Sequence, residues 1–425
     1  MPEIIPDRSL SYIEGTQRVF DQDKTLDKAK EGLKGIGVTR VAGITDLDRL
    51  GIPVFSTIRP SAAEGAISVY SGKGTTENQA RISAMMESYE RCLAERKGLN
   101  KDVIEDIAAP HTITTYDEIS EYGPALRPES LLISEAYSSE NLIEWILGWD
   151  LLKRNEVAVP ANAVYHPYEA PGQTVQLFRT NTNGLAAGNV LEEAILHGLL
   201  EVIERDALST AEFNRYPEKE IILTEEDGEN YELLQRFTDN DVEVKLWLLP
   251  HDTDIPTVVA ATDDIRLKDP ALLVMGAGSH LKPEIAIKRA LTEAAQSRVV
   301  QIHGAREDTE REKFVREIGY DRIKRMNRYW YEEGKKISMA DIRDLSKNSP
   351  AENIDTVLEQ LGKIADSAIV VNLSRESIPV PVVRVIIPGF EMYTLDRERL
   401  GKRAKAGKKK KMSREERPWR HRVHK

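Results

Sequence analysis

Apolar residues recur at helical spacing in three long segments, which dominate the hydrophobic pattern of the chain. These segments cover about 75–95, 191–208 and 283–304, and the spacing predicts a helix in each. A shorter helix is expected over 25–37, where the helical pattern ends in glycines. Extended runs predict strands at 38–48, 52–60, 66–74, 242–250, 255–264, 271–280, 365–374 and 380–388. Several of these strands follow one another without a helix, which predicts an α+β or α/β fold with largely antiparallel sheets.

The three long helices share a sequence pattern and follow glycine-containing segments. Each has Ala, then Ala or Gly four residues later, then Glu, and then Glu or Gln three residues further on. The matching residues are Ala80, Ala84, Glu87 and Glu90; Ala194, Gly198, Glu201 and Glu204; and Ala286, Ala290, Glu293 and Gln296. Glycines precede the helices at Gly74, Gly188 and Gly278. The pattern predicts a strand–helix unit that is used three times.

Helical geometry places the polar residues of each pattern on one face. In the second helix, His197, Glu201, Glu204 and Arg205 share a face, whereas the opposite face is apolar. An ordinary solvent-facing side is the simplest interpretation of one such helix. The helix over 191–208 is apolar enough to be largely buried, however, and buried carboxylates need cations or hydrogen-bond donors. We therefore expect the three polar faces to meet.

Converging carboxylates repel one another unless a cation lies between them. Mg²⁺ with a polyphosphate would supply that charge, and Arg91, Arg205 and Arg289 could each hold phosphate oxygens. The sequence has no GxxxxGK[ST] loop, because SGKGTT has a glycine after its lysine and lacks the first glycine. Lys73 in that stretch is interpreted as a turn lysine or as a phosphate contact.

Composition limits the class of protein. A single cysteine, Cys92, excludes an intrachain disulfide and a cysteine-based zinc cluster, and its place on the apolar face of its helix argues against a catalytic thiol. The chain has no apolar run of membrane-spanning length and no signal core at its start, so we expect a cytoplasmic protein without a membrane partner.

The charge is distributed unevenly between the two ends of the chain. The net charge is −11, but residues 402–425 carry 12 Lys/Arg against two Glu, so residues 1–401 are strongly acidic. We expect one catalytic domain over 1–401, with subdomain breaks near 100–180 and 210–245, followed by a disordered basic tail over 402–425. That tail is the one segment that favours nucleic-acid contact, and a merely solvated end is an equal alternative.

At this point the residues resemble the YcaO family of ATP-dependent enzymes, which activate peptide backbone amides. Ser83, Glu87 and Arg91 match the family's S-x3-E-x3-R motif, and Glu201 and Glu204 match its E-x2-E motif. Glu293 and Gln296 resemble its third motif, although Val300 stands where that motif has Arg, with Arg289 or Arg298 as substitutes. GTQRVFDQDKT, TNGLAAGN and IPVPVVRVIIPGFEMY resemble further family segments, so the resemblance covers about residues 10–395.

The resemblance implies a YcaO-like fold with the repeated units around a central ATP site, and it implies roles for particular residues. The implied catalytic residues are Glu201, Arg205 and Glu293. The implied ATP contacts are Arg18, Ser83, Glu87, Arg91, Asn183, Arg205, Arg289 and Gln296. The implied Mg²⁺ ligands are Glu87, Glu90, Glu201, Glu204 and Glu293.

Within this family we favour thioamide formation, with sulfide as the nucleophile, because the resemblance begins near the N-terminus without an appended leader-binding region. Similar stand-alone archaeal members form a thioglycine in the α subunit of methyl-coenzyme M reductase. The resemblance therefore implies that subunit as the substrate, a sulfide source, a TfuA-type partner and a homo-oligomer. Two alternatives remain open: an azoline-forming cyclodehydratase of ribosomal peptides, and a nucleotide-binding accessory protein for modification of a ribosomal protein.

Overall fold

Three sheets account for the named strands in the part of the chain that the structure describes. The computed structural model describes residues 3–14, 16–96, 111–133, 136–305 and 311–407. The first sheet has the order β1-β2-β3 and contains β1 (Arg40–Gly43), β2 (Val54–Ile58) and β3 (Val69–Lys73). The second has the order β11-β10-β9-β8-β12 and contains β8 (Lys219–Ile222), β9 (Val242–Leu248), β10 (Thr257–Asp264), β11 (Met275–Ser279) and β12 (Lys335–Ser338).

The third sheet has the order β4-β5-β13-β14-β7, with β6 paired to β5. Its strands are β4 (Thr112–Thr114), β5 (Ile143–Asp150), β6 (Asn155–Pro160), β7 (Leu185–Ala187), β13 (Ile369–Asn372) and β14 (Val382–Ile386). The β8–β12 pair is parallel, whereas the other pairings of these strands are antiparallel. The predicted mixed, largely antiparallel architecture is therefore confirmed.

Helices cover and separate these sheets. They are α1 (Gln22–Glu31), α2 (Glu77–Leu93), α4 (Tyr116–Tyr122), α5 (Leu191–Asn214), α6 (Glu229–Thr238), α7 (Pro283–His303), α8 (Arg311–Ile318), α9 (Tyr320–Met326), α10 (Pro350–Leu361) and α11 (Lys402–Gly407). Short 3₁₀ helices lie at 45–47, 128–131, 161–163, 225–227, 270–272, 328–330 and 339–341. The predicted helices over 75–95, 191–208 and 283–304 are present as α2, α5 and α7.

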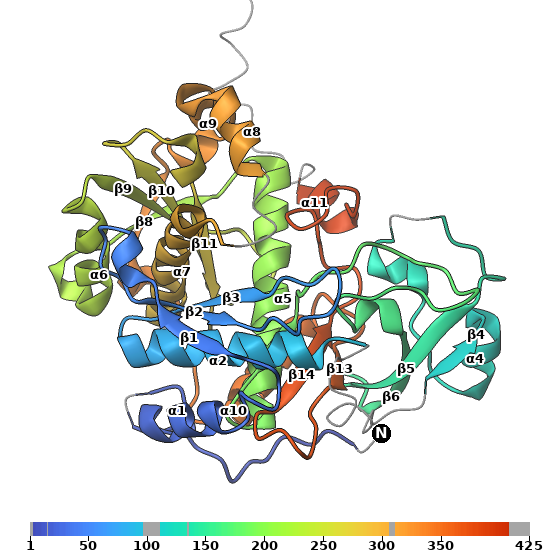
Figure 1. Cartoon of the computed structure of the whole chain (residues 1–425). Coiled ribbons are helices and arrows are strands. Elements are labelled where there is room, and N and C mark those ends of the chain that lie inside the picture. Colours follow the sequence, from blue (N-terminus) through green and yellow to red (C-terminus); the bar gives the residue numbers. More distant parts are fainter. Residues whose placement is uncertain (1–2, 15, 97–110, 134–135, 306–310, 408–425) are drawn as a thin grey trace, which may run out of the picture.

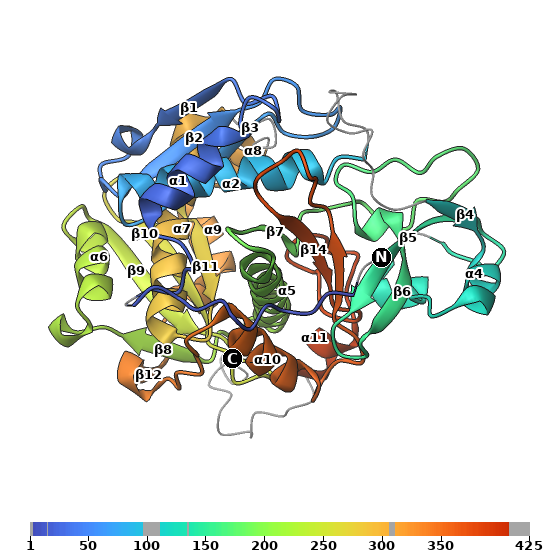
Figure 2. The ribbon, with the colours of Figure 1, turned by 90° about the horizontal axis from the view of Figure 1, so that it is seen from below.

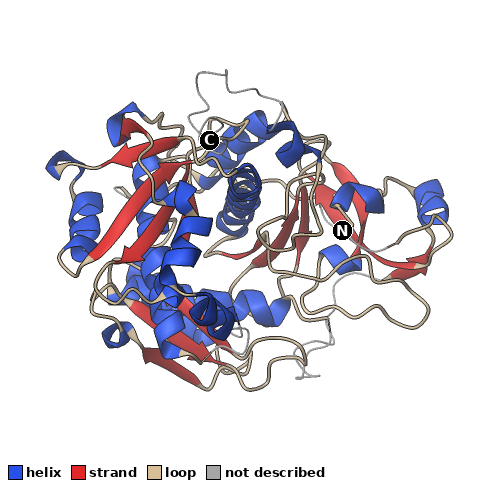
Figure 3. Cartoon of the chain, turned by 90° about the horizontal axis from the view of Figure 1, so that it is seen from above, coloured by secondary structure: helices blue, strands red, loops and turns tan. Residues whose placement is uncertain are grey.

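Helix α5 lies at the centre of the molecule. Figure 1 shows it between the sheet of β8–β11, which α7 accompanies, and the sheet that contains β13 and β14. Figures 2 and 3 view the molecule from below and from above, and both show strands on opposite sides of this helix. Most of the apolar residues of this 24-residue helix are buried, and Ile195, Leu199 and Ile203 are fully so. A helix surrounded in this way has no large solvent face on which to spread its charged residues.

Glycines allow each repeated strand to lie directly against its helix. Gly72 on β3 is so close to α2 that a Cβ there would lie 1.9 Å from the backbone nitrogen of Ala84. In the third unit, a Cβ on Gly276 would lie 2.1 Å from the backbone nitrogen of Ala294. No side chain larger than hydrogen fits at either position. The glycine and alanine positions of the repeated pattern therefore set the strand-to-helix distance.

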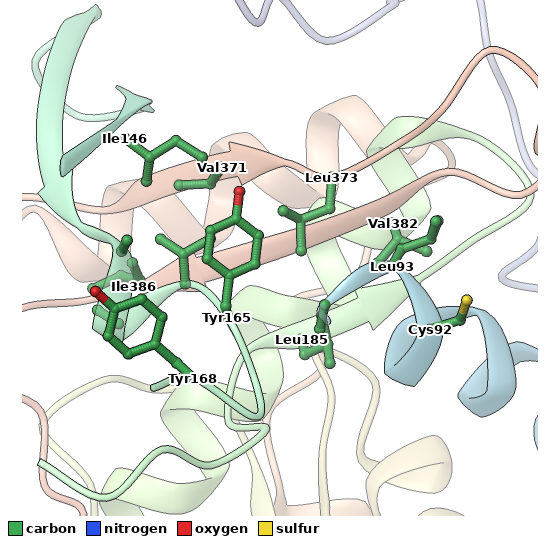
Figure 4. Close-up of a cluster of buried hydrophobic side chains, with 14 of the residues drawn as sticks. Cys92, Leu93, Ile146, Tyr165, Tyr168, Leu185, Val371, Leu373, Val382 and Ile386 are labelled. Atoms are coloured by element: carbon green, nitrogen blue, oxygen red, sulfur yellow. The ribbon is translucent and has the colours of Figure 1, made fainter. Parts of the chain in front are cut away.

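The largest apolar cluster fills the space between the third sheet and the end of α2. Figure 4 shows part of this cluster, where Cys92 and Leu93 of α2 lie near Leu185 and Val382 of the sheet. Burial raises the pKa of the Cys92 thiol to about 11, which keeps it protonated at neutral pH. The packing thus supports the interpretation of Cys92 as a core residue.

The C-terminal end differs from the sequence prediction. Lys402–Gly407 was assigned to a disordered tail, but these residues form α11, and the remainder, 408–425, lies outside the described residues. The Arg403 guanidinium donates to the Asp206 carboxylate on α5 at 2.9 and 3.0 Å, and Ala404 is fully buried. The Glu391 carboxylate accepts the backbone N–H groups of Gly401 (2.7 Å) and Ala404 (2.8 Å). Composition alone missed these long-range contacts.

No described helix combines the length and the apolar character that a bilayer-crossing segment needs.

Candidate active site

One polar side chain on each of the three long helices forms a hydrogen bond with a strand. In each case the strand is the one that precedes a different long helix. The hydrogen bonds run from Ala187 N to Glu90 Oε1 (2.8 Å), from Ser279 N to Glu204 Oε2 (3.0 Å) and from Gln296 Nε2 to the Ser71 carbonyl oxygen (2.5 Å). Helix α2 thus contacts the unit of α5, α5 contacts the unit of α7, and α7 contacts the unit of α2. The polar faces therefore meet, as the sequence pattern predicts.

Glu293 on α7 lies between two cations. Lys73 at the end of β3 forms an ion pair with one carboxylate oxygen, and Arg205 on α5 lies 3.8 Å from the other. Burial alone would raise the pKa of Glu293, but these cations outweigh it and lower the pKa to about 2. Lys73 is thus a site lysine, because its ammonium group links β3 to α7.

Arg205 is held among carboxylates. Its guanidinium lies 3.4 Å from Glu204 Oε1, in addition to its approach to Glu293. Burial opposes its charge, but Glu204, Glu293 and Glu201 together keep its pKa raised. An arginine in this setting stays charged and can present its remaining N–H groups to phosphate oxygens.

Glu201 is the carboxylate that the described residues leave without a partner. No hydrogen bond or ion pair joins its side chain to any of them, although Glu204 on the same helix and Glu90 on α2 both have backbone donors. Burial raises the pKa of Glu201 to about 7, against the opposing effect of Arg205. Burial also raises the pKa of Glu90 well above its usual value, and the charge of Glu201 adds to that effect. The two carboxylates therefore favour a cation between α2 and α5.

A second part of the site is cationic. Arg289 Nη2 donates to His197 Nε2 at 3.2 Å, while the buried Nε of Arg289 has no partner among the described residues. Burial, followed by the charges of Arg289 and Arg18, lowers the pKa of His197 well below its usual value and that of His280 to about 3. Both imidazoles are neutral, so they add hydrogen-bonding atoms without adding charge.

Arg18 reaches this region on an N-terminal arm, which we define as residues 3–14 and 16–21. The arm is attached to the start of α5, where Asp7 N donates to Glu192 Oε1 and Val19 N donates to Glu193 Oε1, both at 2.8 Å. Arg18 itself is exposed. The structure thus brings Arg18 near α5 from a position about 180 residues away in the chain.

The remaining predicted residues lie on α2 and at its neighbours. Glu87 Oε1 accepts a hydrogen bond from Arg91 at 3.0 Å, and its other oxygen accepts Ser71 N at 3.4 Å. Ser83 is half-buried on the same helix, and none of the described residues hydrogen-bonds to its hydroxyl group. The structure therefore places Glu87 and Arg91 at the site, while the nucleotide roles of Ser83 and Arg91 stay predictions.

The five predicted Mg²⁺ ligands do not form a closed metal cage. Across the described ranges, no group of three or more His, Cys, Asp or Glu residues is arranged to hold a metal ion. Mg²⁺ in ATP-dependent enzymes is held by one or two carboxylates together with phosphate oxygens and water. Glu201, which lacks a partner, and Glu90, which has one donor, fit that requirement. Glu204 fits it less well, because its side chain is 3% exposed and already contacts Ser279 N and Arg205.

One predicted substitute for the missing motif arginine lies in a buried ion-pair cluster. Arg298 is fully buried and donates to Asp48 at 2.8 and 3.1 Å and to Asp264 at 3.0 Å. These contacts join α7 to the loop after β1 and to β10. Arg298 Nη1 and Arg289 Nε are both buried without a partner among the described residues, but the whole Arg298 side chain is enclosed. Arg289, which donates to His197, remains the candidate phosphate contact.

Replacing Arg298 by Lys should lower stability without affecting nucleotide binding. Lysine keeps the charge but cannot form the bidentate contact with Asp48, so we expect the free energy of unfolding to fall by on the order of 2 kcal/mol. Urea unfolding would measure the loss, and calorimetric titration with Mg²⁺·ATP should show unchanged affinity. Weaker nucleotide binding by a variant that is otherwise folded would restore Arg298 as a phosphate contact.

Arg384 on β14 is a residue that the sequence analysis missed. It is 5% exposed, its Nε donates to the Ala163 carbonyl oxygen at 3.1 Å, and its Nη2 donates to the Asn181 carbonyl oxygen at 2.9 Å. Its Nη1 is buried and has no partner among the described residues. The signal was a single arginine inside the apolar run PVPVVRVIIP, where a buried charge needs a function or a partner.

Asn183 lies beside Arg384 at a cavity of about 30 Å³. It is 3% exposed, its Nδ2 contacts Met392 Sδ at 3.3 Å, and its Oδ1 is buried without a partner in the described structure. No hydrogen bond among the described residues joins Asn183 to the polar faces of α2 or α7. Its predicted role as an ATP contact stays a prediction.

Comparison with known proteins identifies the chemistry that this arrangement supports. Residues 71–391 match the family described as "YcaO cyclodehydratase, ATP- and Mg²⁺-binding". A protein of Methanothermobacter thermautotrophicus is 48% identical over 386 residues, which is 90% of this chain and 97% of that protein. A protein encoded in the tfuA 3′ region of Rhizobium leguminosarum bv. trifolii is 30% identical over 400 residues, covering 88% of this chain and 89% of that protein.

A solved structure is similar over nearly the same range. It is the structure of YcaO from Methanopyrus kandleri bound with AMPPCP and Mg²⁺, which is 32% identical in sequence. The TM-score is 0.72, and the match covers 90% of this chain and 95% of that chain. The fold predicted from the sequence motifs is therefore confirmed.

Proposed function

The chain belongs to the YcaO family of ATP- and Mg²⁺-dependent enzymes that modify peptide backbones, and from that premise we propose that it converts a backbone amide to a thioamide. ATP activates the amide by phosphorylation, and sulfide is the nucleophile. We propose the methyl-coenzyme M reductase α subunit as the substrate and glycine as the modified residue. A TfuA-type partner would deliver the sulfide, and the protein would act in the cytoplasm as a homo-oligomer.

The distribution of charged side chains over the three helices supports the ATP-dependent part of the proposed reaction. Partner-free Glu201 on α5 acts on the Glu90 carboxylate of α2, whereas Arg289, with its unpartnered Nε, lies on α7. A magnesium–triphosphate complex has the complementary division, with a cation at one end and phosphate oxygens at the other. Both unsatisfied groups would be satisfied by one such ligand.

Mg²⁺ would be held by Glu201 and Glu90, with Glu87 next to them. When bound, it offsets the negative charge of the phosphate oxygens. The residues of the chain then have separate tasks. Arg205 and Arg289 orient phosphate oxygens, and the ion pair between Lys73 and Glu293 keeps Glu293 ionised so that it fixes Arg205. Positioning of this kind supplies most of the rate in phosphoryl transfer.

The proposed reaction balances without an enzyme nucleophile. Hydrosulfide adds to the amide carbonyl carbon, and the resulting oxyanion takes the γ-phosphoryl group of ATP, which releases ADP. The carbon–oxygen bond then breaks to release phosphate, and the sulfur loses its proton as the carbon–sulfur double bond forms. Amide, hydrosulfide and ATP thus give thioamide, ADP and phosphate.

One observation favours sulfide over an internal side-chain nucleophile. One relative, at 30% identity, is encoded in a tfuA region, and the predicted sulfide-delivery partner is of the TfuA type. Cyclodehydration stays the second candidate function, because the matched family is described as a cyclodehydratase.

The purified full-length protein, given ATP, Mg²⁺, sulfide and a glycine-containing peptide of the proposed substrate, should increase the peptide mass by about 16 Da, the difference between sulfur and oxygen. Mass spectrometry measures the change, and omission of sulfide is the control. Loss of a water mass from a peptide with Cys, Ser or Thr, with or without sulfide, would instead show cyclodehydration. Failure to consume ATP with either peptide would favour the accessory-protein alternative.

A further inference from the structure

The cavity beside Arg384 has two buried guanidinium groups and no acidic lining residue. Arg384 and Arg399 both line it, and they are 5% and 2% exposed. Arg399 donates to the carbonyl oxygens of Leu131 (2.6 Å) and Leu132 (3.0 Å), and its guanidinium lies 3.8 Å from the Phe178 ring centroid. Carbonyl dipoles and an aromatic face reduce the cost of buried positive charge, but they do not neutralise it. The cavity is therefore suited to an anion.

Its volume restricts the size of that anion. About 30 Å³ exceeds the roughly 10–15 Å³ that one water needs, and a cavity of this size favours a small anion over a bulky one. Apolar side chains, including Phe178, Phe390 and Val202, form much of the remaining wall. Such a wall disfavours strongly hydrated ions and favours a polarisable one.

The two unsatisfied polar atoms at the cavity differ in kind. Arg384 Nη1 is a donor without an acceptor, and Asn183 Oδ1 is an acceptor without a donor. A hydrosulfide ion has one negative sulfur that accepts from an arginine and one S–H that donates to an amide oxygen. A halide satisfies the arginine alone, and a neutral water leaves the buried charge unbalanced.

The cavity is also next to the proposed reaction site. Val202, which lines it, follows Glu201 on α5, and the charge of Arg384 acts on the Glu201 carboxylate. We propose that this cavity is a hydrosulfide-binding pocket, in which Arg384 and Asn183 hold the nucleophile beside Glu201 before it adds to the amide. This inference rests on the proposed function, since it names the place where hydrosulfide binds before that reaction.

Crystals of the full chain soaked in sodium hydrosulfide test binding without relying on activity. We expect an anomalous sulfur peak between Arg384 and Asn183, separate from the Met392 sulfur, and a sodium bromide soak tests for a general halide site. Val202→Ile adds one methyl group to the cavity wall and should remove the peak. No peak, a peak that Val202→Ile leaves unchanged, or a peak with bromide alone would overturn the pocket.

Kinetics on the same variants separate this pocket from the proposed function. An added methylene in a small pocket changes binding by about 10- to 200-fold, so Val202→Ile should raise the KM for sulfide at least tenfold while the KM for ATP stays within about twofold. Val357→Ile is the matched control, because Val357 on α10 belongs to the same apolar cluster as Val202 but does not line the cavity. Arg384→Met should also lose the peak, and Val202→Ile covers the case in which Arg384→Met does not fold.

The two ideas can fail independently. If the wild-type protein forms thioamide but Val202→Ile keeps the normal KM for sulfide, the pocket is wrong and the function stands. If the hydrosulfide peak is present but no thioamide forms with any peptide, the pocket stands and the proposed function falls.

Discussion

Replacing Glu201 by Gln should lower ATP-dependent turnover by about 100- to 1000-fold while leaving the ligand-free protein as stable as the native one or more stable. The carboxylate is half-buried without a partner among the described residues, so its charge is unfavourable until a cation arrives. Glutamine keeps the shape and removes that charge. The same change thus removes the proposed Mg²⁺ contact, and it also removes an unfavourable charge from the ligand-free protein.

The pH dependence of this effect has a definite sign. The pKa of Glu201 is raised from 4.5 to about 7 in the folded protein, so the folded state binds the proton more tightly than the unfolded state. Its ionisation therefore reduces stability as the pH rises from about 4.5 to 7, and the reduction is complete above that range. Above about pH 7, Glu201→Gln should be more stable than the native protein by on the order of 1–3 kcal/mol.

Thermal unfolding with and without Mg²⁺·ATP measures both parts of this prediction. The native protein should gain stability from the ligand, and Glu201→Gln should gain much less. Glu359→Gln, an exposed glutamate on α10, serves as the control and should behave like the native protein in both conditions. A Glu201→Gln variant that keeps the full ligand-induced stabilisation would show that Glu201 does not hold the metal.

Replacing Asp206 by Ala should destabilise the protein by about 3–5 kcal/mol, the largest effect on folding that we expect. Asp206 is fully buried and accepts hydrogen bonds from His251 (2.9 Å), Arg403 (2.9 Å) and the backbone N–H of Glu391 (2.7 Å). Removing the carboxylate leaves these donors unpaired in the interior. Helix α11 should then detach from α5.

The matched comparison for this prediction is Asp252→Ala. Asp252 lies 3.5 Å from the same Arg403, but its side chain is 48% exposed, so its loss should change stability by no more than about 1 kcal/mol. Chemical unfolding measures both variants, and limited proteolysis near Lys402 reports on α11. Equal effects of the two substitutions would contradict the importance that we assign to the buried pair.

Acid should weaken the contact of α11 with α5. Burial alone would raise the pKa of Asp206, but His251 and Arg403 outweigh burial and lower it. A carboxylate with a lowered folded pKa stabilises the protein above its ordinary pKa of 3.8, and this contribution is lost as the pH falls through the lowered value. Proteolysis near Lys402 should therefore be slow at neutral pH and become faster as the pH falls through the lowered pKa of Asp206.

Much of the fold and half of the site could be predicted because they depend on local patterns. The helices α2, α5 and α7 follow from apolar spacing, and the predicted Gly74, Gly188 and Gly278 precede them at close contacts with the helices. The polar faces follow from the same spacing. Contacts that join distant segments could not be predicted in this way. Residue type does not reveal that Arg298 forms ion pairs with Asp48 and Asp264. It also does not reveal that Lys73 pairs with Glu293, or that Arg403 binds Asp206 and so attaches α11 to α5.

The attachment of both chain ends to α5 has a consequence for the synthesis of the protein. The N-terminal arm leaves the ribosome first, yet its partners Glu192 and Glu193 are made about 180 residues later. Arg384 and Arg403 are among the last described residues to be made. The charge of Arg384 acts on Glu201 of α5, and Arg403 donates to Asp206 of the same helix. A nascent chain therefore cannot complete this site until translation is nearly finished. We expect incomplete chains released before Arg384 to lack ATP-dependent activity, which would restrict amide activation to full-length protein.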